Sequence, residues 1–294
     1  MGNFLKRTIS SFVFAAVMLF AFLSNYILAR FGVPAETVQL CSKLIYGVLF
    51  LFILIVMMKE FLTMTCGKNY RYSQILSIFS GATLFTLVFL FKAFGFPGRL
   101  VILSFIPVFI LMINSLYEKS KSRFDMFANL YTAILYIAVP WSLLNFAVIN
   151  YTTGDFNGVL LLCFFCVIWA GDVGAYLFGI TLGQKYGKKL FPSISPKKSW
   201  IGFWGGMFTA MLVAATLHYT GMMSFDLVHC LALAVLLDVM GVYGDLIESQ
   251  WKRHYDIKDS GNAIPGHGGL LDRFDSALIG IPIGIIYLVV MNVL

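Results

Sequence analysis

Long apolar runs recur along the whole chain, and they constrain its fold more than any other feature. About nine runs of roughly 20 residues can be recognised, each long enough to cross a bilayer as a helix. They cover roughly residues 10–30, 40–62, 75–93, 99–116, 127–148, 158–180, 201–220, 226–248 and 275–294. Because backbone groups in lipid must be hydrogen-bonded within their own segment, each run is expected to be helical. We therefore predict an all-α, polytopic integral membrane protein with about nine transmembrane helices.

The composition agrees with this class and argues against others. Hydrophobic residues make up 60% of the 294 residues, whereas soluble domains are usually about half apolar. The runs are too long for the strands of an outer-membrane barrel, and they lack the strict alternation that such strands require. The first run is not followed by a clear small-x-small cleavage site, so we expect it to be a retained span rather than a signal peptide.

The basic residues predict how the spans are oriented. If the N-terminus is cytoplasmic, only four of the 21 Lys and Arg residues fall outside, namely Arg30, Lys43, Lys92 and Arg99. The opposite orientation would reverse this split, against the positive-inside bias. We therefore place the N-terminus in the cytoplasm and the C-terminus outside. The net charge of +7 is then topogenic charge that also suits anionic lipid headgroups, and it indicates no nucleic-acid partner.

The chain changes character near residue 150. The acidic residues that we assign to the apolar runs all follow this point, and charge at such depth usually faces an aqueous cavity or a partner. They are Asp172, Asp238, Asp245 and Glu248. We expect residues 1–150 to form a five-helix scaffold, and residues 151–294 to form a catalytic half of four helices with cytoplasmic loops 183–200 and 249–273.

A first candidate site lies in the sixth run, in the segment Trp169–Tyr176. Asp172 and Tyr176 are four residues apart and share one face of a helix. Gly171 and Gly174 would let another helix approach closely. The segment fits a helix-packing motif as well as it fits a functional site.

A second candidate lies in the lysine-rich loop before the seventh run. Prolines at positions 192 and 196 disfavour a continuous helix there. Most lysines of this loop are explained as topogenic charge. Lys198 differs, because the preceding Ser195-Pro196 pair fixes the chain at the membrane face, and we select it as a ligand-binding residue.

A stripe of polar residues lies along the eighth run and continues just past its end. Asp238, Asp245, Glu248 and Ser249 recur with nearly helical spacing, which predicts a polar cleft along an otherwise apolar helix. Asp238 lies deeper than the others and fits a purely structural role equally well.

The stretch Ser249–Asp275 is the most densely charged part of a chain in which only 12% of residues are charged. It also contains His267 and the pair Gly268–Gly269, and glycines allow backbone conformations closed to other residues. A helix that begins near Leu270 would point its first N–H groups toward the same side. This combination is typical of a site for a phosphate-rich ligand and a metal.

Asp245 and Asp272 come from different elements and could share a magnesium ion. Magnesium favours oxygen ligands, keeps several waters and is commonly shared with substrate phosphates. Asp275 follows Asp272 by three residues on one side of the helix. His267 has no His or Cys companion, so we expect it to contact phosphate or order the loop. Because the chain lacks a Walker loop, a Rossmann glycine pattern and a Gly-x-Ser-x-Gly elbow, the chemistry should depend on metal and lysines.

The Ser249–Ser276 signature resembles that of the integral-membrane CDP-diacylglycerol synthases, also called phosphatidate cytidylyltransferases. Its residues are Ser249, Lys252-Arg253, Lys258-Asp259-Ser260-Gly261, Pro265-Gly266-His267-Gly268-Gly269, Asp272-Arg273 and Asp275-Ser276. Three upstream segments match as well, namely Gly244-Asp245-Leu246, Asp172 to Tyr176 and Ser195 to Ser199. The likeness covers roughly the last 130 residues, and the first half matches only in being hydrophobic.

The resemblance implies transfer of a cytidylyl group from CTP to phosphatidate, giving CDP-diacylglycerol and pyrophosphate, with Mg²⁺ held by Asp245 and Asp272. It leaves open whether a second cation binds, and it implies a homodimer. The implied catalytic residues are Asp245, Asp272, Lys252 and Arg273. The implied substrate-binding residues are Lys198, Ser195, Asp172, Ser249, Arg253, Lys258, Asp259, His267, Gly268, Gly269 and Asp275. The compact length favours a bacterial cytoplasmic membrane, and the topology puts the site at its cytoplasmic face.

Other interpretations stay open at this point. A related CTP-using enzyme could act on another lipid, as a polyprenol kinase or an archaeal-type ether-lipid cytidylyltransferase does. An ion-coupled transporter could use Asp172, Asp238 and Asp245 as an ion path, but it predicts inverted repeats and broken helices that we do not find. An inactive scaffold is disfavoured because the acidic and basic residues occur together.

Overall fold

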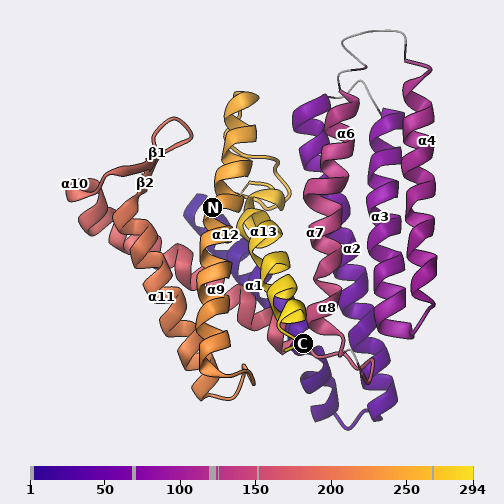
Figure 1. Cartoon of the computed structure of the whole chain (residues 1–294), viewed down its shortest axis with the longest axis horizontal. Helices are drawn as coiled ribbons and strands as arrows, with labels where there is room; N and C mark the ends of the chain where they lie inside the picture. The colour runs from indigo at the N-terminus through magenta and orange to yellow at the C-terminus, as the bar shows by residue number, and fades with distance from the viewer. Residues whose placement is uncertain are drawn as a thin grey trace. The chain divides into compact units, whose positions relative to one another are not determined.

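The computed structural model describes residues 3–67, 71–118, 124, 126–150, 152–266 and 268–293, with residues 3–7 and 71 described by their backbone alone. Within these residues, nine helices are long and apolar enough to cross a membrane (Figure 1). They are Thr8–Arg30, Ala35–Cys66, Tyr72–Phe94, Gly98–Ser115, Phe127–Val148, Val159–Tyr186, Trp200–Tyr219, Leu227–His254 and Leu271–Val290. The predicted class and number of spans are therefore confirmed, while the orientation of the termini stays a prediction.

The chain divides into two compact units. Unit 1 comprises Met1–Gly158 and Asp259–Arg273, and unit 2 comprises Val159–Lys258 and Phe274–Leu294. The late segment Asp259–Arg273 thus belongs with the first half of the chain. It contributes the loop that precedes the last helix.

Unit 1 is built from helices that follow the first five apolar runs. They are α1 (Asn3–Arg30), α2 (Ala35–Cys66), α3 (Arg71–Phe94), η1 (Gly98–Ser104), α4 (Phe105–Ser115), α6 (Phe127–Ala133), η2 (Ile134–Ala138), α7 (Val139–Leu143) and α8 (Asn145–Val148). The fifth run is divided among the last four of these, because Pro140 has no N–H with which to continue the regular helical pattern. The wider π-helical bonds of η2 occur just before it.

Aromatic side chains form the core of unit 1. The rings of Phe50 and Trp141 stack with their centroids 5.1 Å apart, and Tyr46 packs 4.3 Å from Phe50. The indole Nε1 of Trp141 donates to the backbone carbonyl of Phe50 at 2.9 Å, so its polar group is satisfied inside the core. These contacts fix α2 against α7.

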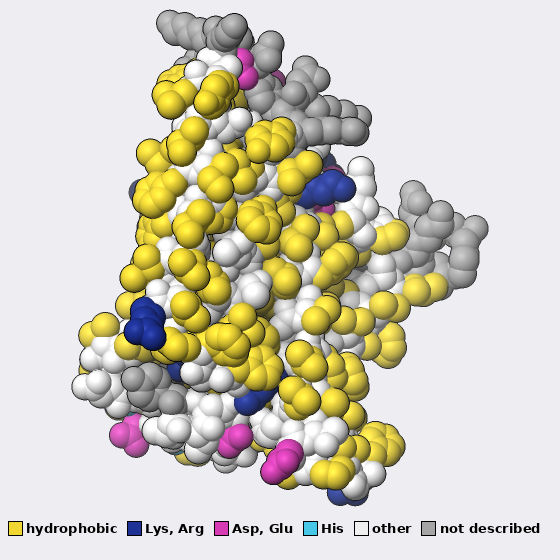
Figure 2. Space-filling view, turned by 90° about the vertical axis from the view of Figure 1, so that its right-hand side faces the viewer, with side chains coloured by type: hydrophobic (Ala, Val, Ile, Leu, Met, Phe, Trp, Pro, Cys, Tyr) yellow, Lys and Arg dark blue, Asp and Glu magenta, His cyan; other side chains and the backbone are white. Residues whose placement is uncertain are grey.

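The outer surface of this protein is apolar over large areas. Figure 2 shows a face that is covered largely by hydrophobic side chains, with few charged ones. On α4, Phe105, Phe109 and Ile113 are each more than half exposed. Exposed apolar faces of this kind suit contact with lipid, as expected for transmembrane helices.

Unit 2 is built around the close packing of two helices. Its elements are α9 (Val159–Phe178), η3 (Gly179–Gly183), α10 (Gln184–Tyr186), β1 (Lys189–Phe191), β2 (Ser195–Ser199), α11 (Trp200–Tyr219), α12 (Leu227–His254) and α13 (Leu271–Val290), whose first turn lies in unit 1. Glycines let α9 and α11 approach closely: a Cβ on Gly206 would lie 2.8 Å from the carbonyl oxygen of Gly171, and one on Gly174 would collide with Thr209. The expected close approach at Gly171 and Gly174 is confirmed.

The two predicted cytoplasmic loops differ from expectation in their detail. The first contains a hairpin in which β1 and β2 pair antiparallel, and Pro196 is tolerated because a two-stranded sheet has only edge strands. The second is shorter than the predicted range 249–273, because α12 continues to His254. Ser249, Lys252 and Arg253 therefore lie on a helix, which is a correction to the predicted loop.

Candidate active site

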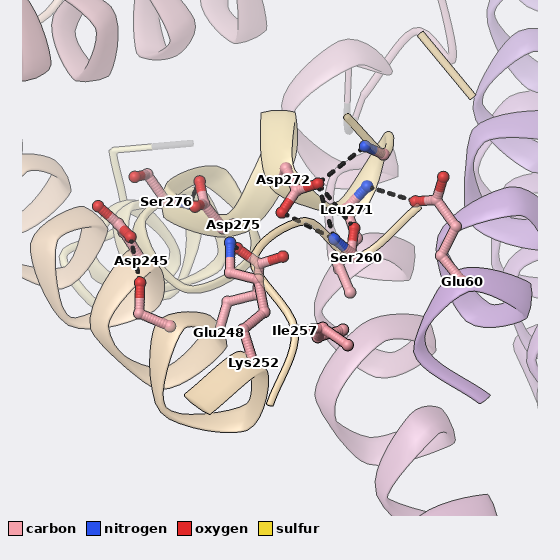
Figure 3. Close-up of polar contacts among 12 residues, drawn as sticks. Glu60, Asp245, Glu248, Lys252, Ile257, Ser260, Leu271, Asp272, Asp275 and Ser276 are labelled. Carbon is pink, nitrogen blue, oxygen red and sulfur yellow. Dashed lines mark hydrogen bonds and ion pairs between the residues drawn. The ribbon is translucent and has the colours of Figure 1, made fainter. Parts of the chain in front are cut away.

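The predicted site residues fall into two groups, one in each unit. In unit 2, Lys198 extends from β2, and its ammonium Nζ lies 2.8 Å from Oδ2 of Asp245 on α12. Ser249, one turn further along α12, donates from its hydroxyl to Oδ1 of Asp245 at 3.1 Å (Figure 3). Both carboxylate oxygens of Asp245 are thus held, one by a cation and one by a neutral donor. Lys198 and Asp245 are each partly exposed, so the pair is accessible.

A second ion pair lies nearby on the same helix. The Nζ of Lys252 is 2.8 Å from Oε2 of Glu248, four residues earlier, and Glu248 is only 1% exposed. Asp275 on α13 lies against Glu248 and accepts a hydrogen bond from the backbone N–H of Ser276 at 2.7 Å. Removing these two charges from water is costly, and the attraction between Lys252 and Glu248 offsets that cost only while both are present.

Asp172 on α9 adds a further negative charge to this group. Its side chain is exposed and experiences the charges of Asp275, Asp245, Lys198 and Asp238. Within the described part of the chain it makes no direct hydrogen bond, so nothing there supports a helix-packing role for this carboxylate. Asp238 is 5% exposed and its side chain lies close to Gly171.

The carboxyl groups of this part of unit 2 gather in one cluster. We define the carboxylate cluster as Asp172, Asp238, Asp245, Glu248 and Asp275. The ammonium groups of Lys198 and Lys252 each pair with a carboxylate of this cluster. Among the described residues, no three His, Cys, Asp or Glu side chains are already arranged to hold a metal. Magnesium does not need such a cage, because one or two carboxylates, waters and substrate phosphates suffice.

In unit 1, the loop before α13 holds Asp272. Oδ2 of Asp272 accepts from the hydroxyl of Ser260 at 3.0 Å, from its backbone N–H at 3.0 Å and from the N–H of Gly269 at 2.8 Å (Figure 3). Oδ1 accepts a longer bond, 3.2 Å from the N–H of Ser260. Asp272 is therefore oriented by hydrogen bonds from the loop, as metal-binding carboxylates usually are.

Glycine is required at position 268 of this loop. Gly268 has a φ of +91°, and a Cβ at this position would lie 2.8 Å from Oδ2 of Asp272 and 3.4 Å from Cβ of Asp259. Both the backbone conformation and the lack of space exclude larger residues. The glycines that the sequence singled out thus allow the loop to close tightly over Asp272.

Sequence reasoning missed Glu60. The expectation that acidic residues inside the spans all follow residue 150 is wrong, because Glu60 lies within α2 and is only 8% exposed. Its Oε2 accepts a hydrogen bond at 2.9 Å from the backbone N–H of Leu271, the first residue of α13 (Figure 3). The available signal was a carboxylate beside Lys59 near the end of an apolar run, where charges are commonly assigned to the membrane boundary.

The remaining predicted residues are partly or fully exposed, and one lies outside the described residues. Ser195 is partly buried opposite Phe191 in the hairpin, and Arg253 is exposed and donates to the carbonyl of Ile257 at 3.4 Å. Lys258, Asp259 and Arg273 are exposed. His267 lies outside the described residues.

A glycine next to Asp245 makes the packing of unit 2 testable. A Cβ on Gly244 would collide with the backbone carbonyl of Asp275, whereas a Cβ on Gly241, one turn earlier, would meet nothing closer than 3.5 Å. We expect Gly244→Ala to lower the free energy of unfolding by about 1–3 kcal/mol through overpacking. Gly241→Ala is the matched control and should melt at or slightly above the wild-type temperature, because alanine favours helix. Equal melting of the two variants in detergent would contradict the close approach.

Comparisons with known proteins agree with the resemblance noted in the sequence. Residues 5–291 match the model of the cytidylyltransferase family. The phosphatidate cytidylyltransferase of Staphylococcus haemolyticus is 31% identical over 238 residues, which cover 81% of this chain and 87% of that protein. That of Bacillus subtilis is 38% identical over 176 residues, covering 60% of this chain and 63% of the relative, and that of Staphylococcus aureus is 34% identical over 175 residues, covering 60% and 64%. The last two alignments thus span less than two thirds of the relatives. Because the family model covers nearly the whole chain, this protein belongs to the cytidylyltransferase family.

Proposed function

We propose that this protein is a membrane-bound phosphatidate cytidylyltransferase that converts CTP and phosphatidate to CDP-diacylglycerol and pyrophosphate. The observation that carries the proposal is the Lys198–Asp245 pair within the carboxylate cluster, in a chain that belongs to this family. The relatives from three bacteria all carry this name.

The chemistry of the reaction suits the residues present. The attacking group is a phosphate monoester, which carries a charge of about −1.5 to −2 near neutrality and needs no general base. The obstacle is repulsion between two polyanions. Fixed positive charges that are preorganised where charge develops lower this barrier. We assign this role to Lys198, Lys252 and Arg273.

Asp245 and Asp272 would hold Mg²⁺, which when bound neutralises charge on the nucleotide phosphates and the leaving pyrophosphate. The pairing of these two residues rests on the signature, and the structure describes the surroundings of each by itself. Ser249 and Lys198 orient Asp245, while Ser260 and Gly269 orient Asp272. Groups that orient metal-binding carboxylates in this way commonly affect metal affinity as strongly as they affect activity.

Location and assembly are also part of the proposal. The basic residues favour a cytoplasmic N-terminus, an external C-terminus and a site at the cytoplasmic face of a bacterial inner membrane. The remaining substrate-binding assignments made from the signature are retained, with phosphatidate drawn from the bilayer and its acyl chains remaining in lipid. A homodimer is proposed from family resemblance.

The direct test uses purified protein in detergent or vesicles with CTP, Mg²⁺ and phosphatidate. We expect stoichiometric release of pyrophosphate and CDP-diacylglycerol, and none without the lipid. Parallel reactions with a polyprenol and with an archaeal-type ether lipid distinguish the related CTP-using enzymes. Product only from one of those acceptors, or ion flux into vesicles that needs no CTP, would reject the proposal in favour of the corresponding alternative.

A further inference from the structure

Glu60 is a buried carboxylate in a transmembrane helix that the reaction itself does not use. Placing a charge at such a position is costly and needs a compensating partner. The partner is the N-terminus of α13, where the N–H of Leu271 donates to Oε2 of Glu60 at 2.9 Å. The backbone N–H groups of Leu270 and Ala263 lie near the same carboxylate. A negative charge at a helix N-terminus also interacts favourably with the helix dipole.

The loop before α13 is shaped around this side chain. A Cβ on Gly269 would lie 2.6 Å from Oε2 of Glu60, and the three atoms nearest to a Cβ on Gly261 all belong to Glu60, with Cδ at 2.7 Å and Cγ at 2.8 Å. Glu60 therefore occupies space that any residue other than glycine would need at both positions. At Gly261 the nearest atoms all belong to Glu60, whereas at Gly269 the hydroxyl of Ser260 lies closer still and Glu60 comes next.

The same loop residues hold Asp272. Gly269 donates its N–H to Oδ2 of Asp272, and Ser260, next to Gly261, donates both its N–H and its hydroxyl. The contacts thus form a continuous path from Glu60, through Gly269 and the Ser260–Gly261 pair, to the carboxylate of Asp272. A change at Glu60 reaches Asp272 through one residue, Gly269, on one branch and through two, Gly261 and Ser260, on the other.

From this path we infer that Glu60 is a positioning residue, which fixes the loop before α13 so that Asp272 is held in the orientation that the reaction needs. The inference rests on the proposed function. It gives helix α2, in the first half of the chain, a part in the site, whereas the sequence predicted that this half is only a scaffold. Glu60 itself touches neither substrate nor the reacting atoms in this scheme.

The test compares Glu60→Ala and Glu60→Gln with Glu36→Gln, an exposed glutamate in the first turn of the same helix. We expect Glu60→Ala to lower kcat about 10–100-fold and to raise the Mg²⁺ concentration for half-maximal activity, as is typical when groups behind a metal-binding residue are removed. Glu60→Gln keeps an oxygen that can accept from Leu271 and should lose less. Glu36→Gln should match wild type. A purely structural role would lower the amount of folded protein without changing the Mg²⁺ dependence.

A second readout does not depend on activity. Hydrogen–deuterium exchange at the backbone N–H groups of Ser260, Gly269 and Leu271 should be faster in Glu60→Ala than in wild type, with exchange in α9 and α11 unchanged. If wild type shows no cytidylyl transfer but this exchange still responds, the proposed function fails and the positioning role stands. The inference would be overturned if both Glu60 variants had the kcat, the Mg²⁺ dependence and the loop exchange of wild type.

The glycine contact allows a stricter test. Gly261→Ala alone should impair activity, because its methyl group would collide with Glu60. In the double variant Glu60→Ala/Gly261→Ala the removed side chain leaves room for the methyl group, so its activity should be no lower than that of Glu60→Ala. Losses that simply multiply would show that the two positions act independently and would contradict the inference.

Discussion

Replacing Asp245 or Asp272 with asparagine is expected to lower turnover about a hundred- to a thousandfold while the protein still inserts into the membrane. Asparagine keeps the size of aspartate but not its charge, so it binds a divalent cation poorly and leaves repulsion between the two phosphate substrates unopposed. Loss of a single preorganised group that stabilises developing charge typically costs about 10²–10³ in turnover. The measurement is pyrophosphate release by each purified variant at saturating CTP and phosphatidate.

The matched control is Asp226→Asn, which makes the same chemical change at the exposed residue preceding α12. It should retain wild-type turnover. Membrane insertion should be the same for all three variants, and the melting temperature of each separates a loss of chemistry from a loss of fold. A double variant, Asp245→Asn/Asp272→Asn, that turns over at the wild-type rate would exclude both carboxylates from the reaction.

Lys252→Met is expected to have the largest effect on stability. It removes the ion-pair partner of Glu248, which is almost completely buried and lies against Asp275. Removing one member of a buried pair usually costs about 3–5 kcal/mol, because the remaining charge is no longer compensated. Thermal unfolding in detergent micelles measures the loss.

Two further variants show whether the effect comes from the pair. Glu248→Gln/Lys252→Met removes both charges and should recover most of the lost stability, since a buried ion pair can often be replaced without cost. Lys188→Met, at an exposed position, should melt as wild type does. If the double variant melts no higher than Lys252→Met, the lost stability does not come from an uncompensated Glu248.

The helices could be predicted from sequence because each depends on a local property. Twenty consecutive apolar residues are enough to specify a transmembrane helix whatever its neighbours are, and every predicted run corresponds to a described helix. The end of α12 was placed too early for the same reason. The charges of Lys252 and Arg253 predicted a loop at these positions. In the structure α12 extends to His254, and Lys252 forms an i,i+4 ion pair with Glu248 on this helix.

The site was predictable to the extent that its residues lie in motifs that can be recognised in the sequence. Asp245, Ser249 and Lys198 could be selected from spacing and resemblance, and the structure places these three in contact. Glu60 could not, because its hydrogen bond joins positions that are 211 residues apart. No periodicity or motif connects positions so distant, and only the folded chain shows that the glycines of the loop make room for a side chain of α2.

Because Asp259–Arg273 completes unit 1, the first half of the protein cannot finish folding when its own residues have been synthesised. At about 5–20 residues per second, roughly 10–40 s separate the emergence of Glu60 from that of Leu271. Throughout this interval the nascent chain carries an acid at the membrane whose donors in the loop before α13 have yet to be translated. Polypeptides released before that point are expected to be recognised by membrane quality-control proteases, so the ribosome's progress sets when the protein becomes resistant to degradation.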